Sequence, residues 1–293
     1  MPQKRRSWKL SMNTMAPLTE KRAREIRSAG FNHVYLDDIF QDPRRRKINL
    51  RTLKSFPELT ALSAHAPVLT ETWEYNEPDL LKKISRIIDI SADFKLKFVT
   101  FHPEPSFPGG GGRKKQEMDY QQPGPRKRYR EAFPRVFKEA ARYASRYGIT
   151  LTIENMLPHP FGNYMIGPAE IISLIKDVGE PNVGACLDSG HAVLAGQPPE
   201  MFIKELGRLL KETHFQDTLW PEGTSAAGMD LHRPPGIGSI DWVKVMDALE
   251  EIGYPGVVNF ELGLRPKDKG PAELYGVAYK NWRMLERLRE MVS

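Results

Sequence analysis

Short apolar runs that end in a histidine or a carboxylate recur along this chain. The clearest is Val183–Leu187, which is followed at once by Asp188 and three residues later by His191. A run that begins with a β-branched residue and stays apolar is typical of a strand buried on both faces. Such a strand places the two metal-capable side chains after it at one edge of a sheet. One such pair is a weak signal, but other apolar runs in the chain end in the same way.

The hydrophobic pattern predicts eight strands separated mostly by helices. The expected strands are Lys9–Met12, His33–Ile39, Ala61–Pro67, Phe98–His102, Thr150–Glu154, Val183–Leu187, Thr213–Asp217 and Val257–Leu262. The expected helices are Thr19–Ala29, Pro78–Phe94, Tyr129–Tyr147, Pro168–Val178, Pro198–Lys211, Ser239–Ile252 and Ala272–Met291. This alternation favours an α/β fold, a single (β/α)₈ TIM barrel over residues 1–293. A doubly wound open sheet fits less well, because no glycine-rich phosphate-binding motif follows the first strand.

The longest connection is a loop rich in glycine, proline and basic residues at about residues 103–130. It contains four consecutive glycines, Gly109–Gly112, and the basic clusters Arg113–Lys115 and Arg126–Arg128. A connection of this length inside one domain is usually a lid, a binding loop or a mobile excursion. It could cover an active site and neutralise a substrate phosphate, and a disordered loop explains it equally well.

Charge and cysteine content narrow the class of protein. The chain has 43 Lys and Arg against 37 Asp and Glu, a net charge of +6. Mild basicity suits an acidic ligand and permits nucleic acid, although an ordinary basic surface explains it equally well. Cys186 is the only cysteine, which excludes an intrachain disulfide, and we expect it in the core. Because no signal peptide or membrane-spanning run is evident, we expect a soluble, cytoplasmic protein.

Six histidines and carboxylates fall at the ends of the third to eighth predicted strands. They are His65, His102, Glu154, Asp188, His214 and Glu261. In a barrel these positions share the face that carries the active site. So many titratable groups in one place would repel and desolvate each other unless a cation were bound. We therefore expect a divalent metal held by Glu154, Asp188, His214 and Glu261, with Mn²⁺, Co²⁺, Zn²⁺ or Fe²⁺ the best suited ions. The alternative is a buried network of salt bridges.

A further cluster, Asp230 with His232, follows in the segment Met229–Trp242. With His191 it could complete a second site, because Asp-x-His on a loop can chelate a metal or orient a ligand. Alternatively, His232 is a surface histidine beside Arg233. His33 and His159 are expected to face solvent or to make local hydrogen bonds.

The chain resembles the xylose isomerase-like barrel superfamily, which contains sugar isomerases and epimerases as well as endonuclease IV. The motifs that carry the resemblance are H-A-P at 65–67, F-H-P at 101–103, I-E-N at 153–155, C-L-D-S-G-H at 186–191, H-F-Q-D at 214–217, D-L-H-R-P-P-G-I-G at 230–238 and F-E-L at 260–262. The resemblance to the epimerases implies one metal on Glu154, Asp188, His214 and Glu261, with His191 contacting the substrate.

The resemblance to the endonucleases implies up to three zinc ions. The first would bind His65, His102 and Glu154, and the second the set of four just named. The third would bind His191, Asp230 and His232. All nine positions are filled, yet Ser189-Gly190-His191 replaces the Thr-Cys-His of the endonucleases, and Leu231 stands where they usually have Arg. The motif from His232 to Gly238 is closer to the sugar-isomerase members.

We therefore favour an isomerase or epimerase that acts on a sugar, a sugar phosphate or a related polyol ketone through an enediolate. Glu154 and Glu261 would move the proton, while His191, Trp73 and Arg233 are candidate substrate contacts. The alternative is an endonuclease IV-like zinc phosphodiesterase acting on abasic DNA, and a metal-free binding barrel comes third. A homo-oligomer is possible, because aromatic residues such as Trp73, Tyr75 and Trp220 fit a subunit contact as well as a ligand.

Overall fold

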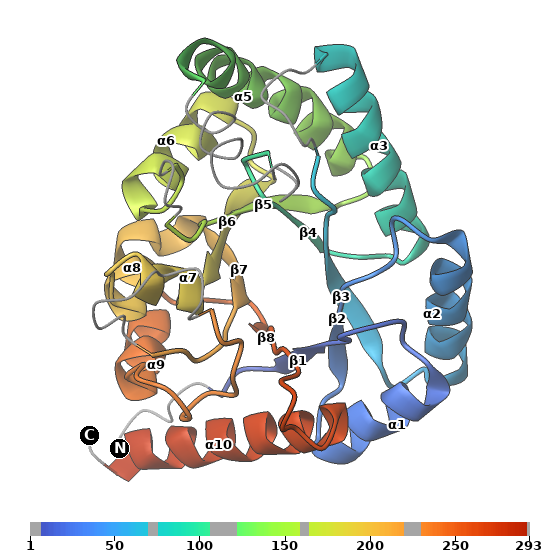
Figure 1. Cartoon of the computed structure of the whole chain (residues 1–293), viewed down its shortest axis with the longest axis vertical. Helices are drawn as coiled ribbons and strands as arrows, with labels where there is room; N and C mark the ends of the chain where they lie inside the picture. Colours follow the sequence, from blue (N-terminus) through green and yellow to red (C-terminus); the bar gives the residue numbers. More distant parts are fainter. Residues whose placement is uncertain (1–6, 70–75, 106–121, 159–163, 220–229, 292–293) are drawn as a thin grey trace.

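Eight parallel strands form a barrel surrounded by helices (Figure 1). The structure is a computed structural model, and it describes residues 7–69, 76–105, 122–158, 164–219 and 230–291. The strands are β1 (Leu10–Asn13), β2 (His33–Leu36), β3 (Thr60–His65), β4 (Phe98–Phe101), β5 (Thr150–Glu154), β6 (Val183–Asp188), β7 (Leu210–His214) and β8 (Val258–Phe260). The predicted (β/α)₈ barrel is confirmed.

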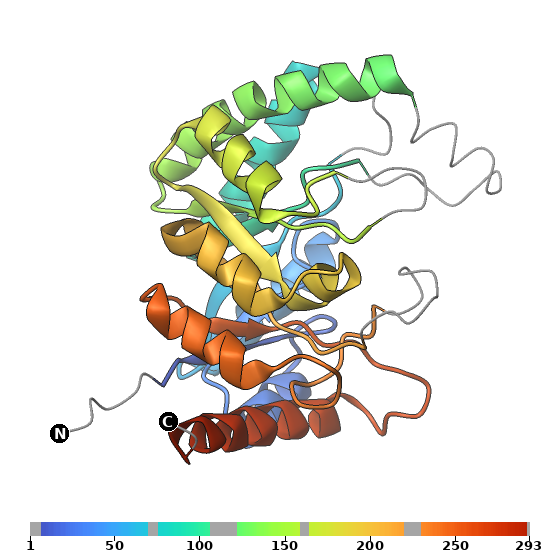
Figure 2. The same ribbon diagram turned by 90° about the vertical axis from the view of Figure 1, so that its left-hand side faces the viewer.

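The helices lie outside the barrel (Figures 1 and 2). They are α1 (Glu20–Ala29), α2 (Pro43–Ser55), α3 (Glu77–Asp93), α5 (Pro123–Ser145), α6 (Pro168–Val178), α7 (Ser189–Leu194), α8 (Pro199–Leu206), the 3₁₀ turn η1 (Gly207–Leu209), α9 (Trp242–Glu251) and α10 (Pro271–Met291). Their apolar faces pack on the outward side chains of the strands. Phe137 of α5 meets Phe101 of β4, for example, with ring centroids 5.4 Å apart.

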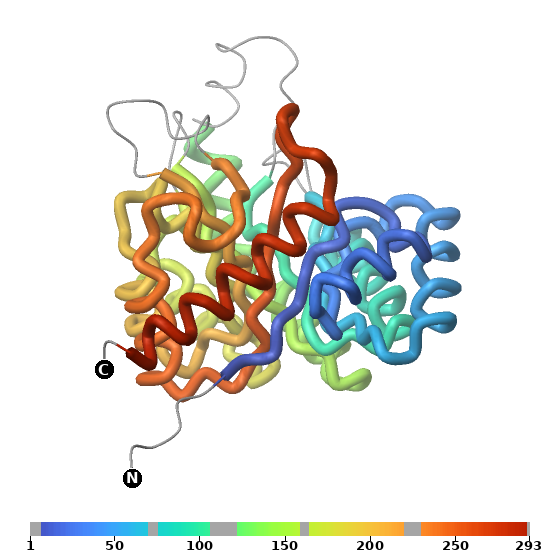
Figure 3. The backbone as a smooth tube through the Cα atoms, turned by 90° about the horizontal axis from the view of Figure 1, so that it is seen from below, coloured from blue at the N-terminus to red at the C-terminus, as the bar shows by residue number. Residues whose placement is uncertain are grey.

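The barrel closes where β8 joins β1 on one side and β7 on the other. β1 pairs with both β2 and β8, and β7 joins β8 through a bridge between Phe215 and Phe260. In that bridge Phe215 N donates to Asn259 O at 2.8 Å, and Glu261 N donates to Phe215 O at 3.1 Å. Outside the strands, α10 runs alongside α1 (Figure 3). Gly30 ends α1 at φ 110°, and a Cβ there would lie 2.6 Å from the Tyr279 ring.

The seventh strand lies earlier than predicted. The sequence pattern extended a helix to Lys211 and began the strand at Thr213, whereas α8 ends at Leu206 and β7 covers Leu210–His214. The cause is that Glu212 and His214 point into a polar barrel interior, so the strand lacks the usual apolar alternation. The corrected boundaries make His214 the last residue of its strand.

Three helical segments also differ from the prediction. α2 was missed because it buries little apolar surface, and its fully buried residues are Asn49 and Thr52. α7 begins at Ser189, where a turn was expected, and Asp188 caps it by accepting a hydrogen bond from His191 N at 2.7 Å. α5 begins at Pro123, so residues 126–128 are helical rather than part of the loop. Residues 106–121 of that loop lie outside the described residues.

Polar side chains fill two levels of the barrel interior, because residues two apart on a strand face the same side. The upper layer, at the carboxyl ends of the strands, consists of Asn13, Asp37, His65, His102, Glu154, Asp188, His214 and Glu261. The lower layer, two residues earlier on each strand, consists of Ser11, Tyr35, Ser63, Thr100, Thr152, Cys186, Glu212 and Asn259. Barrel interiors are usually dominated by branched apolar residues. The polar interior therefore calls for a functional explanation.

Candidate metal centre

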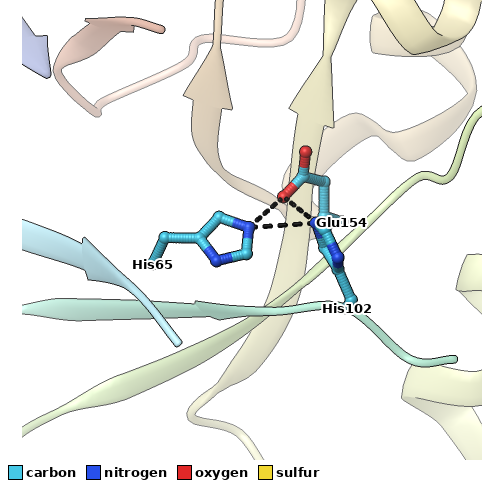
Figure 4. Close-up of side chains that lie close together, drawn as sticks. All are labelled: His65, His102 and Glu154. Atoms are coloured by element: carbon cyan, nitrogen blue, oxygen red, sulfur yellow. Dashed lines mark hydrogen bonds and ion pairs between the residues drawn. The ribbon is translucent and has the colours of Figure 1, made fainter. Parts of the chain in front are cut away.

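One group in the upper layer brings together His65, His102 and Glu154 (Figure 4). Oε2 of Glu154 lies 3.1 Å from Nε2 of His65 and 3.4 Å from Nε2 of His102. The two imidazole nitrogens are 3.0 Å apart. Two ligands that each lie about 2.1 Å from a tetrahedral ion are about 3.4 Å apart, so this triangle has the size of a metal-ligand set.

A second group contains Glu154, Asp188, His214 and Glu261, whose candidate ligand atoms all lie within 4.8 Å of one another. Nδ1 of His214 is 3.3 Å from Oε2 of Glu154 and 3.0 Å from Oε2 of Glu261. The four residues end β5, β6 and β7 or directly follow β8. Glu154 belongs to both groups, so the two predicted ligand sets share one carboxylate.

The hydrogen bonds of these histidines fit metal ligation. Nδ1 of His65 lies 2.6 Å from Ala66 O, and because a carbonyl only accepts, Nδ1 carries the proton and Nε2 is left for a ligand. Both ring nitrogens of His214 are buried without a hydrogen bond of normal geometry among the described residues. Nδ1 nonetheless lies 3.0 Å from Oε2 of Glu261 and 3.3 Å from Oε2 of Glu154, so two carboxylates hold His214 either as an imidazolium or as a ligand of a bound cation. The residues present therefore fit a divalent ion.

The third predicted set, His191, Asp230 and His232, is not among the groups of described residues whose ligand atoms lie within 4.8 Å of one another, although both histidines lie near Asp230. Its Oδ2 atom is 3.0 Å from Nε2 of His232 and 3.7 Å from Nε2 of His191. Nδ1 of His191 donates to Asn155 O at 2.8 Å, and Nδ1 of His232 donates to Glu261 O at 3.1 Å. Both histidines thus turn Nε2 towards Asp230.

Gln216, to which the sequence assigned no role, connects this set to the second group. Its Nε2 donates to Oδ1 of Asp230 at 2.7 Å and to Oδ1 of Asp188 at 3.3 Å. Its Oε1 accepts from the backbone N of His232 at 2.8 Å. The signal was its position in H-F-Q-D, two residues after a ligand.

Protons supply the positive charge in this arrangement of side chains. Burial alone would raise the pKa of Glu154, but the His214 charge and hydrogen bonds from His102 and His65 hold that pKa well below its usual value. Burial likewise opposes protonation of His214, but neighbouring Cys186, Glu261 and Glu154 raise its pKa well above the usual value. Burial raises the pKa of Asp188 to about 6. Since metal ligands must lose such protons, an ion would take over the role of the imidazolium charge.

A cavity of about 750 Å³ opens over the upper layer. Its lining includes His65, His102, Glu154, His191, Asp230, His232 and Glu261, together with Met15, Asp37, Asp38, Phe40, Arg45, Val68 and Leu157. Arg233 is not among the lining residues, and its guanidinium pairs with Asp268 at 2.8 and 3.0 Å. Trp73, Tyr75 and Trp220 lie outside the described residues. Substrate contacts by Trp73 and Arg233 stay predictions.

Sequence reasoning missed Asp37, because its predicted strand continued to Ile39. β2 ends at Leu36, so Asp37 follows its strand just as the other candidate ligands follow or end theirs. Burial and the charge of Glu261 raise the pKa of Asp37 to about 7.

The remaining predicted residues have structural surroundings. Cys186 is a buried free cysteine, as expected. His33 is half-buried, and its Nδ1 atom has no hydrogen-bond partner among the described residues. His159 lies outside the described residues.

The chain belongs to the family of xylose isomerase-like TIM barrels, whose pattern it matches over residues 23–280. It is similar to the uncharacterized protein MJ1311 of Methanocaldococcus jannaschii, with 33% identity over 43% of this chain and 41% of that protein. It is 30% identical to a D-psicose 3-epimerase of Ruminiclostridium cellulolyticum, over 42% of this chain and 38% of that enzyme. An inosose dehydratase of Lacticaseibacillus casei is 27% identical over 39% of this chain and 42% of that enzyme. The matches therefore span about two fifths of these relatives.

The fold is shared with solved structures over nearly the whole chain. A xylose isomerase domain protein of Alicyclobacillus acidocaldarius superposes with a TM-score of 0.74 at 20% identity, covering 97% of this chain and 100% of that one. Within the described residues, no helix is both long and apolar enough to cross a membrane.

Proposed function

We propose that this protein is a divalent-metal-dependent isomerase or epimerase of a sugar or a related polyol ketone. The observation that carries the proposal is that two carboxylates of one candidate metal set, Glu154 and Glu261, also line the cavity. They come from β5 and from the end of β8, and their Oε2 atoms lie 3.3 and 3.0 Å from the same nitrogen of His214. The similarity to a D-psicose 3-epimerase supports the same class of reaction.

In the proposed reaction one carboxylate removes a proton from the carbon next to the substrate carbonyl. The other carboxylate returns a proton to the resulting enediolate, on the opposite face for an epimerase, provided that each keeps one oxygen free. A bound divalent ion supplies positive charge that stabilises the developing oxyanion. His191 has its Nδ1–H committed to Asn155 O, and its Nε2, which lies 3.7 Å from Oδ2 of Asp230, is the atom that would contact a substrate oxygen.

Solvent exchange tests this proposal. The protein loaded with Mn²⁺, Co²⁺ or Zn²⁺ is incubated in D₂O with D-psicose, D-fructose and other ketoses, and deuterium at the carbon next to the carbonyl is measured. We expect incorporation that Glu261→Gln abolishes and that the surface variant Asp177→Asn leaves unchanged. Absence of exchange with every ketose, in protein shown to contain metal, would contradict the proposal.

An endonuclease IV-like phosphodiesterase is the second candidate. The observation that favours it is the presence of donors for more than one ion, with Glu154 shared between two groups. About three zinc ions per chain, together with incision of an abasic duplex, would favour this function. About one ion per chain and no incision would favour the isomerase.

A further inference from the structure

Asp37 stands apart from the rest of the upper layer, because it follows β2 while the predicted ligands come from β3 to β8. Asn13 holds the corresponding position at the end of β1, and its side chain is already hydrogen-bonded. Its Nδ2 donates to Leu262 O and its Oδ1 accepts from Leu262 N, both at 3.0 Å. Asn13 therefore joins β1 to the segment after β8, and Asp37 is the remaining side chain of the layer that is not a predicted ligand.

The hydrogen bonds of Asp37 use one oxygen only. Oδ2 accepts from Met15 N and, at 3.4 Å, from Oγ1 of Thr14. Oδ1 makes no hydrogen bond to a described residue, and the side chain lines the cavity. One oxygen thus fixes the carboxylate, and the other is left for a ligand.

The backbone is strained at two residues that line the cavity. Met15, whose amide holds Asp37, has φ 55°, and His232, which lines the same cavity, has φ 46°. Such angles are costly for residues other than glycine and concentrate at functional sites. Of these two residues, Met15 is the one whose backbone amide holds Asp37.

The charges around Asp37 argue against an anionic ligand group. The acidic residues of the cavity lining are Asp37, Asp38, Glu154, Asp230 and Glu261, and Arg45 is the one Arg or Lys among the described lining residues. Arg45 is already paired with Asp38 and, at 3.6 Å, with Asp42. No described Lys or Arg lies within ion-pair distance of Asp37. A phosphate or carboxylate placed directly against Oδ1 of Asp37 would be repelled by that carboxylate, whereas a neutral hydroxyl would donate a charge-assisted hydrogen bond to it.

We propose that Oδ1 of Asp37 accepts a hydrogen bond from a hydroxyl of the substrate and thereby selects a neutral polyhydroxylated sugar over its phosphorylated form. This inference rests on the proposed function, because it takes the cavity to be the sugar site. Asp37 is then a specificity-determining residue whose side chain lines the same cavity as Glu154 and Glu261.

Binding of a sugar alcohol, which has no carbonyl and cannot enolise, tests the inference separately from catalysis. The Mn²⁺-loaded protein is titrated by calorimetry with a hexitol, with its monodeoxy analogues and with its terminal phosphates. We expect loss of one hydroxyl to weaken binding about 10- to 100-fold in the native protein. In Asp37→Ala the same loss should cost less than about threefold, because the acceptor is gone.

Two further variants serve as controls for the effect of Asp37→Ala. Asp37→Asn keeps an acceptor for Met15 N and removes the charge, so it should fold and should lose the discrimination against the phosphates. Asp177→Asn, on the exposed side of α6, should match the native protein in every titration. Tighter native binding of a phosphate, or an Asp37→Ala profile equal to the native one, would overturn the inference.

The two proposals can fail independently. Deuterium exchange into a ketose with an unchanged Asp37→Ala profile would overturn the role of Asp37 and leave the isomerase intact. Hydroxyl selection that depends on Asp37, without exchange into any ketose, would overturn the isomerase and leave Asp37 as a sugar-binding residue.

Discussion

The upper and lower layers of the barrel interior are both polar, and they differ in how their charges are satisfied. In the lower layer the carboxylate of Glu212 accepts from Thr100 at 2.9 Å, from Thr152 at 3.3 Å and from Asn259 Nδ2 at 2.7 Å. In the upper layer, Glu154 has three imidazole nitrogens within 3.4 Å, and His214 has no hydrogen bond of normal geometry. The lower layer also leaves atoms without partners, namely Ser11 Oγ, Tyr35 OH and Asn259 Oδ1, but these are neutral.

The contrast shows that a buried cluster of polar residues is not by itself evidence of a binding site. The lower layer satisfies its one carboxylate mainly with neutral donors. The upper layer holds several charges that only an added cation or added protons can balance. We therefore expect substitutions in the upper layer to change metal content and activity, and substitutions in the lower layer to change stability.

Removing the shared carboxylate should have the largest effect. Glu154→Gln takes away the ligand common to both groups and one of the two proton-transferring residues. We expect metal content to fall and kcat/KM to drop by about 10³-fold or more. Elemental analysis and a steady-state assay check this, with Asp177→Asn as the control. Retention of the full metal content by Glu154→Gln would mean that the upper layer is not a metal centre.

Removing the lower carboxylate should weaken the fold and spare the metal. Glu212→Ala leaves Asn259 Nδ2 and two threonine hydroxyls without their acceptor, and it opens a hole in the interior. We expect a loss of about 3 kcal/mol in the free energy of unfolding, measured in urea on the metal-free protein. Metal content should stay at the native level. A folded Glu212→Ala protein that no longer bound metal would show that the two layers act as one.

Most residues of the upper layer could be predicted from the sequence, whereas the strand boundaries and the contacts within the layer could not. His65, His102, Glu154 and Asp188 end or follow apolar runs, so strand endings alone indicated one shared edge. Asp37 was missed because nothing in D-D-I marks where β2 stops. The predicted start of β7 was wrong because Glu212 and His214 face a polar interior instead of an apolar core.

Distances could not be predicted from the sequence. That Glu154 contacts His65, His102 and His214 together depends on the stagger of neighbouring strands around the closed barrel. The hydrophobic periodicity of the sequence carries no information about that stagger. The bonds of Gln216 depend on it as well, since they join the segment after β7 to Asp188 at the end of β6 and to Asp230 further along the chain.

A buried carboxylate outside both layers separates the cost of burial from metal binding. Glu104 follows β4, its Oε1 is buried without a hydrogen bond to a described residue, and burial raises its pKa to about 8 against the pull of Arg126 and Arg130. Since this pKa is raised, the folded state holds a proton that the unfolded state releases above about pH 4.5. Stability should therefore fall as the pH rises from about 4.5 to 8, by on the order of 4 kcal/mol.

Glu104→Gln should remove that pH dependence. Its melting temperature in the metal-free protein should differ least from the native value at pH 5 and should exceed it most at pH 8 to 9. Metal content should equal that of the native protein, because Glu104 belongs to neither group. Parallel stability curves for the two proteins across this range would show that Glu104 is ionised in the fold at little cost.

Gln216 gives the smallest and most specific test, because it carries no charge and is not a candidate ligand. Its side chain holds Asp188 and Asp230 through Nε2 and the His232 backbone through Oε1.

Gln216→Ala keeps every candidate ligand and removes the side chain that orients three of them. We expect metal affinity to weaken by about 10-fold, within the range typical of residues that position ligands. Competition with a chelator measures the affinity, and Gly190→Ala, whose Cβ would lie 2.4 Å from Nε2 of Gln216, should act in the same direction. If neither variant changes the affinity, the candidate ligands of the upper layer are held by their own strands, and the Asp230 set is independent of the second group.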